Sequence, residues 1–147
     1  MKIWLVAGAF SGVGKTTLVQ NLAKVLPCAE FLKIGHGKKK AVGTPNYFTS
    51  IADGLGFIET LNRRCKHCIV ESNLRAGVLE PDIIIFLDRD GENRRNDADE
   101  FRTAAGIVIG QGANAGKWRD EIGGLKLSSR IEAKVLNLFQ AQHKFLT

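Results

Sequence analysis

The chain has 147 residues, of which 44% are hydrophobic and 24% charged, and its formal net charge is +6 at pH 7. This length excludes a nucleotide-binding domain joined to a separate catalytic domain, and no apolar run approaches the roughly 20 residues of a membrane-spanning helix. The charge suits phosphorylated ligands, and without a zinc-finger spacing or a basic helix we do not expect nucleic acid. The apolar start is too short for a signal peptide, so we expect one cytoplasmic domain over residues 1–147.

The first motif lies between an apolar run, Ile3–Ala7, that predicts a buried strand and a segment, Thr17–Leu26, that predicts a helix. The residues between them contain the Gly-Lys-Thr sequence of a phosphate-binding P-loop. In such a loop, consecutive backbone N–H groups converge on phosphate oxygens at the positive end of a helix. We expect the nucleotide phosphates to be bound by seven consecutive residues: Ser11, Gly12, Val13, Gly14, Lys15, Thr16 and Thr17.

Two side chains of this loop have distinct expected roles. Lys15 is placed to reach the β- and γ-phosphates, and the Thr16 hydroxyl is placed to ligate a magnesium ion that bridges them. The loop departs from the usual pattern at Ala9, which stands where a glycine is common. We expect Gly8, directly before it, to supply the missing backbone freedom.

A strand, a basic loop and a second helix are predicted next. Glu30–Ile34 predicts a short strand that opens into the loop Gly35–Gly43. Thr44 and Pro45 then predict a helix N-terminus, and apolar residues at helical spacing extend this helix to about Arg64.

The basic loop has two interpretations. It lies after the second strand, where it would overlie the phosphates and bind a second anionic ligand, or it is a solvated run of charge. Its candidate ligand-binding residues are His36, Lys38, Lys39 and Lys40.

Two later apolar runs, Cys68–Ser72 and Asp82–Asp88, contain carboxylates at their ends and predict parallel strands buried on both faces. A P-loop works with an acid from a neighbouring strand, which holds the magnesium shell or polarises the nucleophile. We favour Glu71 for this role, because its strand follows the second helix, and we expect Asp88 to lie farther along the edge. Asp88 stays open as the alternative acid and magnesium ligand, and either carboxylate could simply cap a turn.

The C-terminal third continues the alternation of helices and strands. Asn96–Ala105 predicts a short helix, and Gly106–Gly110 predicts a strand that opens into the loop Gln111–Asn114. Ser129 and Glu132 form a capping-box pattern before a C-terminal helix. The whole pattern predicts an α/β three-layer sandwich with a mostly parallel sheet of about five or six strands. Because ligands bind at the carboxyl ends of such strands, we expect the P-loop, both carboxylates and the two loops at one edge.

A cysteine pair leaves another function open. Cys65 and Cys68 have the C-x-x-C spacing of a zinc or redox site, with His67 between them, and Cys28 is the remaining cysteine. A four-ligand metal site would need Cys28, His67 or a second subunit, and the alternative is two ordinary thiols.

An arginine cluster leaves a third function open. Arg89, Arg94 and Arg95 follow the strand that ends in Asp88. They could clamp phosphates as the lid of a small-metabolite kinase, or they could form salt bridges with the acids interspersed among them.

Taken together, these motifs resemble those of the MobB family, the molybdopterin-guanine dinucleotide biosynthesis protein B. The likeness is strongest over Ala9–Leu18, where that family has a similar aromatic-Ser-Gly-x-Gly-Lys-Thr-Thr loop. Lys33 and His36 resemble the lysine and histidines that the family has after its second strand. Val70-Glu71 resembles the family's Val-Glu-Gly element, with Ser72 in place of the glycine.

The resemblance implies GTP binding with Mg²⁺, slow hydrolysis and a homodimer. It also implies an accessory role beside the enzyme that attaches a nucleotide to molybdopterin, a phosphorylated cofactor, with Lys33 among the residues that contact this second ligand. The residues themselves leave guanine and adenine open, because the loop Gln111–Asn114 offers no carboxylate to a base. A small-metabolite kinase, or a nucleotide-regulated metal carrier that uses Cys65 and Cys68, remains an alternative.

Overall fold

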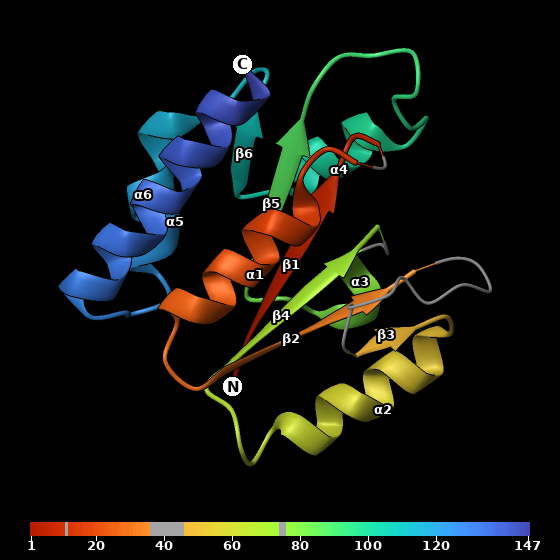
Figure 1. Ribbon diagram of the computed structural model, residues 1–147, viewed down its shortest axis with the longest axis vertical. Helices are drawn as coiled ribbons and strands as arrows, with labels where there is room; N and C mark the ends of the chain where they lie inside the picture. Colours follow the sequence, from red (N-terminus) through yellow and green to blue (C-terminus); the bar gives the residue numbers. More distant parts are fainter. Residues whose placement is uncertain (11, 36–45, 74–75) are drawn as a thin grey trace.

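A computed structural model describes residues 1–10, 12–35, 46–73 and 76–147 of the chain. The described residues form a six-stranded sheet with the strand order β3-β2-β4-β1-β5-β6 (Figure 1). Every strand pair is parallel. Helices cover both faces, which confirms the predicted three-layer α/β fold. The elements are β1 (Lys2–Gly8), α1 (Lys15–Val25), β2 (Ala29–Ile34), β3 (Tyr47–Phe48), α2 (Ile51–Leu61), β4 (His67–Ser72), α3 (Ala76–Leu79), β5 (Ile83–Asp88), α4 (Ala98–Ala104), β6 (Ile107–Gly110), α5 (Ala115–Gly123) and α6 (Ser129–Leu146).

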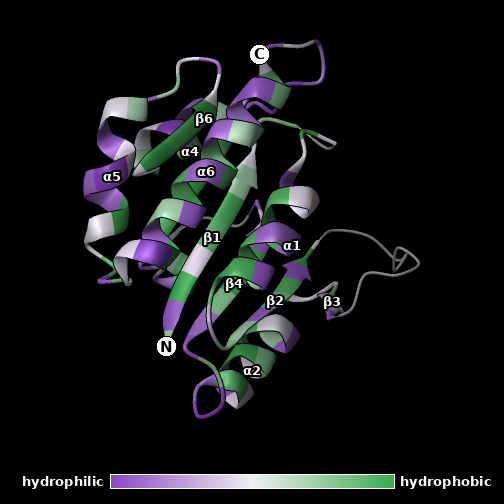
Figure 2. Ribbon diagram, turned by 60° about the vertical axis from the view of Figure 1, so that its left-hand side comes forward, coloured by the Kyte–Doolittle hydropathy of each residue, from purple (hydrophilic) through white to green (hydrophobic). Residues whose placement is uncertain are grey.

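The central strand β1 is buried on both faces, so its alternate residues belong to different cores. Trp4 and Val6 pack in the core covered by α1, α5 and α6. Leu5 packs in the core beneath α2 and α3, whereas Ala7 packs with residues of α4. Much of β1 and most of β6 carry the hydrophobic colours in Figure 2, as expected for strands without a solvent-facing side.

The second helix begins later than the sequence predicts. Thr44 and Pro45 lie outside the described residues, and α2 begins at Ile51 with Ser50 as its N-cap. The Ser50 hydroxyl accepts a hydrogen bond from the backbone N–H of Asp53 at 3.1 Å. Phe48, which has helical spacing to the apolar residues of α2, instead pairs with Ile34 in the parallel ladder between β2 and β3. Strand pairing therefore overrides the local periodicity.

Helix α6 is capped one residue earlier than predicted. The Ser128 hydroxyl accepts from the backbone N–H of Ile131 at 3.3 Å, and Ser129 is the first helical residue. Helices α3 and α5 were not predicted. In α5 only Trp118 and Ile122 are buried, so its apolar stripe is too sparse to give a helical period.

Within the described ranges, no helix has both the length and the apolar character needed to cross a membrane.

Candidate functional site

The topology places the P-loop at the point where the strand order reverses. The chain passes from β1 to β2 on one side of the sheet and from β5 to β6 on the other. Val6 of β1 is in register with Glu71 of β4, and Gly8 is in register with Leu87 of β5. Asp88 is in turn in register with Gly110 of β6. The described elements expected at one edge therefore do meet there, at the place where ligands bind in open α/β sheets.

Two glycines give the P-loop its shape. Gly12 and Gly14 have φ angles of 82° and 103°, in the left-handed region that side chains disfavour. Gly14 is the N-cap of α1, so no side chain caps the helix, and its first turn contains no acidic residue. The backbone N–H groups and the positive end of α1 are thus left for an anionic ligand. Ser11 lies outside the described residues.

Gly8 and Ala9 explain how the loop tolerates its departure from the usual pattern. Neither has a left-handed φ, and Ala9 is fully buried. A Cβ atom on Gly8 would lie 2.4 Å from Val13 Cγ1 and 3.1 Å from Lys15 Cδ. Glycine at position 8 therefore allows the loop and Lys15 to approach β1 closely. The expectation that it supplies backbone freedom was wrong.

The Lys15 side chain is only 9% exposed, and no described residue forms a salt bridge with it. Burial lowers its pKa, the nearby Glu71 carboxylate opposes this, and the positive charges of Lys33 and Arg95 lower the pKa further. Lys15 is thus a buried cation whose positive charge is incompletely balanced. A bound anion at the loop would balance it.

Thr16, Glu71 and Lys33 form a polar cluster beside the loop. The Thr16 hydroxyl donates a hydrogen bond of 2.5 Å to Glu71 Oε1. Lys33 Nζ lies 3.0 Å from Glu71 Oε2, close enough for an ion pair, but no described residue donates a well-aligned hydrogen bond to this buried oxygen. Hydroxyl and carboxylate oxygens are ligands that Mg²⁺ prefers, so Thr16 and Glu71 fit a magnesium ion.

Asp88 lies on the other side of β1 and has different partners. Its oxygens are 3.3 Å from Arg94 Nη2 and 3.2 Å from Arg102 Nη1. The expectation that Asp88 lies farther along the edge than Glu71 was wrong, because β4 and β5 both pair directly with β1. With two guanidinium groups on its carboxylate, Asp88 is less available to a further cation than Glu71 is.

The arginines after β5 are held by acids. Arg94 also pairs with Asp99, with 3.0 Å between Nη1 and Oδ1. Arg95 pairs with Asp97 at 2.9 Å, and this hydrogen bond raises the Arg95 pKa. Arg89 is exposed. For Arg94 and Arg95, the structure agrees with the salt-bridge interpretation rather than with a free phosphate-clamping lid.

The loop after β6 is also tied to its surroundings. Gly110 and Gly112 have positive φ angles of 97° and 64°. The Gln111 amide hydrogen-bonds the Asp90 carboxylate, and the backbone N–H of Asp90 donates to Gln111 Oε1 at 3.0 Å. Asn114 accepts from the backbone N–H of Val108 at 2.8 Å. The loop therefore links the ends of β5 and β6 at the site edge.

The cysteines do not form a metal centre in the described part of the chain. Cys68 is fully buried in β4, and burial raises its pKa to about 12. Cys65 is partly exposed and Cys28 exposed. Among the described residues, no three or more His, Cys, Asp or Glu side chains are grouped so that they could hold a metal ion. The C-x-x-C spacing alone is therefore weak evidence for a metal carrier.

Two residues that contact the P-loop were not predicted from the sequence. Asn73 Oδ1 accepts a hydrogen bond from the backbone N–H of Gly8 at 3.3 Å. Gln142 Nε2 lies 3.5 Å from the carbonyl oxygen of Gly14. A signal existed for Gln142, because it occupies a buried position on the otherwise apolar face of α6 that includes Val135 and Phe139.

His36, Lys38, Lys39 and Lys40 lie outside the described residues, so the structure places only Lys33 among the predicted second-ligand residues.

No protein-family model matches this chain, and no curated protein sequence shows significant similarity to it.

Proposed function

We propose that this protein binds a nucleoside triphosphate with Mg²⁺ at its P-loop and hydrolyses it slowly. The observation that carries the proposal is the pairing of Lys15 with the uncapped start of α1. The largely buried Lys15 side chain, which has no salt-bridge partner among the described residues, lies beside a helix N-terminus that has neither a side-chain cap nor an acid in its first turn. Both features are costly without an anion and favourable with one, which supports a phosphate ligand.

The chain's own groups suggest how the phosphates would be handled. Lys15 would stabilise negative charge that develops on the transferring phosphoryl group. Thr16 would exchange its hydrogen bond to Glu71 for coordination of the metal. Glu71 would then accept a hydrogen bond from a metal-bound or an attacking water. The magnesium ion, when bound, would neutralise charge on the β- and γ-phosphates.

The sequence resemblance supports a narrower version of this proposal. We propose GTP in preference to ATP, a homodimer, a cytoplasmic location, and an accessory role in molybdopterin cofactor biosynthesis or metal-centre maturation. Lys33 lies beside Glu71 at the edge of the loop, a position that suits contact with a second phosphorylated ligand. His36, Lys38, Lys39 and Lys40 would extend that contact.

Calorimetry with Mg-GTP and Mg-ATP tests the proposal on the wild type and on Lys15→Ala. We expect saturable binding by the wild type and a loss of roughly 100-fold in affinity in the variant, because a desolvated charge contact to phosphate is removed. Lys117→Ala, on the exposed side of α5, is the matched control and should bind like the wild type. Equal affinity of Lys15→Ala and the wild type would contradict P-loop binding.

Following the γ-phosphate then separates the reaction classes. We expect water to be the acceptor, so inorganic phosphate should accumulate without any added metabolite. A kinase would instead leave the γ-phosphate on an organic acceptor and release little phosphate in its absence.

A further inference from the structure

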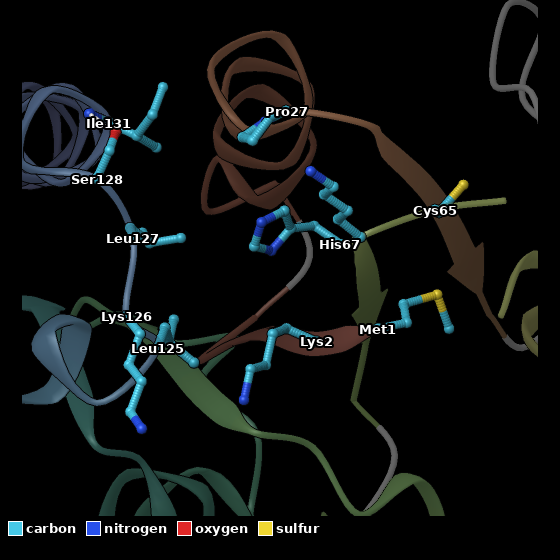
Figure 3. Close-up of a pocket in the computed structure, with 11 residues that line it drawn as sticks. Met1, Lys2, Pro27, Cys65, His67, Leu125, Lys126, Leu127, Ser128 and Ile131 are labelled. Carbon is cyan, nitrogen blue, oxygen red and sulfur yellow. Dashed lines mark hydrogen bonds between the residues drawn. The ribbon is translucent and has the colours of Figure 1, made fainter. Parts of the chain in front are cut away.

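A pocket lies at the opposite end of the sheet from the P-loop. It has a volume of about 440 Å³ and is lined by the starts of β1 and β4, by the end of α1 and by the segment that leads into α6 (Figure 3). Lys2 and His67 at the start of two paired strands belong to it. Since β1 and β4 are parallel, these residues are separated from the P-loop by the length of the sheet.

His67 gives the pocket a directed hydrogen-bond donor. Its side chain is buried, with 5% exposed, and its ring points into the space between Pro27, Leu127 and Lys2 (Figure 3). His67 Nδ1 accepts a hydrogen bond from Trp4 Nε1 at 3.2 Å. In the neutral ring the proton must therefore be on Nε2, which has no hydrogen-bond partner in the described part of the chain. This N–H group is available to a ligand.

The charged residues that line the pocket in the described part of the chain are all positive. Lys2, Lys66 and Lys126 line it, and none of the described lining residues is acidic. None of the three lysines forms a salt bridge with a described residue. Burial lowers the pKa of His67, and neighbouring positive charges, those of Lys66 and Lys2 among them, lower it further. The pocket therefore has an unbalanced positive potential.

The other walls are apolar. Pro27, Leu125, Leu127 and Ile131 supply hydrocarbon surface between the lysines. A pocket with mostly apolar walls and a few polar groups is typical of a site for an organic molecule. Three lysines and a neutral N–H donor match a dianion better than a singly charged carboxylate.

We propose that this pocket binds a small organic phosphate, with its phosphate group between His67 Nε2 and the lysines and its apolar part against Pro27, Leu127 and Ile131. The site is independent of the P-loop and would respond to a different ligand.

Phenyl phosphate is a suitable probe, and NMR of the histidine side chains can follow its binding. The titration uses Lys15→Ala, so that phosphate binding at the P-loop does not contribute. We expect a saturable shift of the His67 imidazole signals and an increase in the His67 pKa, because an anion stabilises the charged ring. The His143 signals, at the other end of the sheet beside Gly110, should not change.

Charge variants distinguish the pocket from general attraction to a basic protein. In the same background, Lys66→Gln/Lys126→Gln should weaken phenyl phosphate binding about fivefold, because two exposed charge contacts are lost. The control Lys117→Gln/Lys144→Gln removes two exposed charges elsewhere and should change the affinity less than about twofold. Both lysines of the test pair are exposed, so the variant is expected to fold.

Three results would overturn the proposal. The first is the absence of a saturable His67 shift, and the second is equal weakening in the two double variants. The third is binding of a control ligand as tight as that of phenyl phosphate. Equally tight binding of benzoate would show that the site does not select a dianion, and equally tight binding of inorganic phosphate would show that it does not select the apolar group.

Discussion

Glu71 and Asp88 lie on the two strands that flank the central strand, yet their surroundings differ. Both side chains are buried, and both belong to strands that pair directly with β1. Glu71 is bound to Thr16 of the P-loop and to one partly exposed lysine, whereas Asp88 is held by Arg94 and Arg102. A carboxylate at the right strand end is therefore insufficient for a role at the site, because its partners determine whether it is available.

The largest expected difference between the two acids is in turnover. Glu71→Gln should lower triphosphate hydrolysis roughly 100-fold, because it removes the charge that orients the metal shell or the water. Asp88→Asn should lower it less than about fivefold, because the Asp88 charge is already balanced by arginines. The rate of phosphate release at saturating nucleotide measures the turnover of both variants. The reverse ranking would transfer the acidic role to Asp88.

The next largest difference is in stability, with the opposite ranking. Asp88→Asn should lower the free energy of unfolding by about 1–2 kcal/mol, a modest value because Arg94 and Arg102 can still reach water. Glu71→Gln should lower it by less than about 0.5 kcal/mol, since its ion-pair partner Lys33 is partly exposed and Lys15 is a neighbouring charge that forms no salt bridge with it. Urea unfolding measures both variants, with Asp99→Asn as an exposed control that also pairs with Arg94. A greater loss in Glu71→Gln would show that Glu71 is the structural acid.

The smallest expected effect concerns the protonation of Lys15. Its pKa is lowered from 10.5, chiefly by burial, so at alkaline pH below that value part of the free protein lacks this proton. Phosphate binding favours the charged form and should therefore take up protons. Glu71 raises the Lys15 pKa, so Glu71→Gln should increase the uptake, whereas Asp88→Asn should leave it unchanged. Calorimetry of Mg-ATP binding in buffers of different ionisation enthalpy measures the uptake. Equal uptake in all three proteins would contradict the coupling of Glu71 to Lys15.

The local features of the site could be predicted from the sequence because each has a strong short-range signal. The apolar run before the P-loop, the Gly-Lys-Thr sequence and the helical spacing after it define β1, the loop and α1. The apolar runs that contain Glu71 and Asp88 likewise define β4 and β5. Since parallel strands end at one edge, the meeting of these residues follows from the strand pattern alone.

The partners of these residues could not be predicted, because they depend on strand order and helix placement. Nothing local indicates that β5 pairs with β1, or that Arg102 of α4 reaches Asp88. The same limit explains why Phe48 was expected in the second helix. It has helical spacing to the apolar residues of α2, but in the folded sheet it belongs to β3 and pairs with Ile34. Glycine at position 8 was recognised for the wrong reason, since its contact with Val13 exists only in the folded loop.

The dependence of triphosphate affinity on magnesium tests the central claim most directly. That claim is that Thr16 and Glu71, and not Asp88, complete a metal-assisted P-loop. GTP and ATP binding would be measured by calorimetry with Mg²⁺ and with EDTA in the wild type, Glu71→Gln and Asp88→Asn. We predict that Mg²⁺ strengthens binding in the wild type and in Asp88→Asn, and that most of this gain is lost in Glu71→Gln. A gain that persists in Glu71→Gln and disappears in Asp88→Asn would contradict the account.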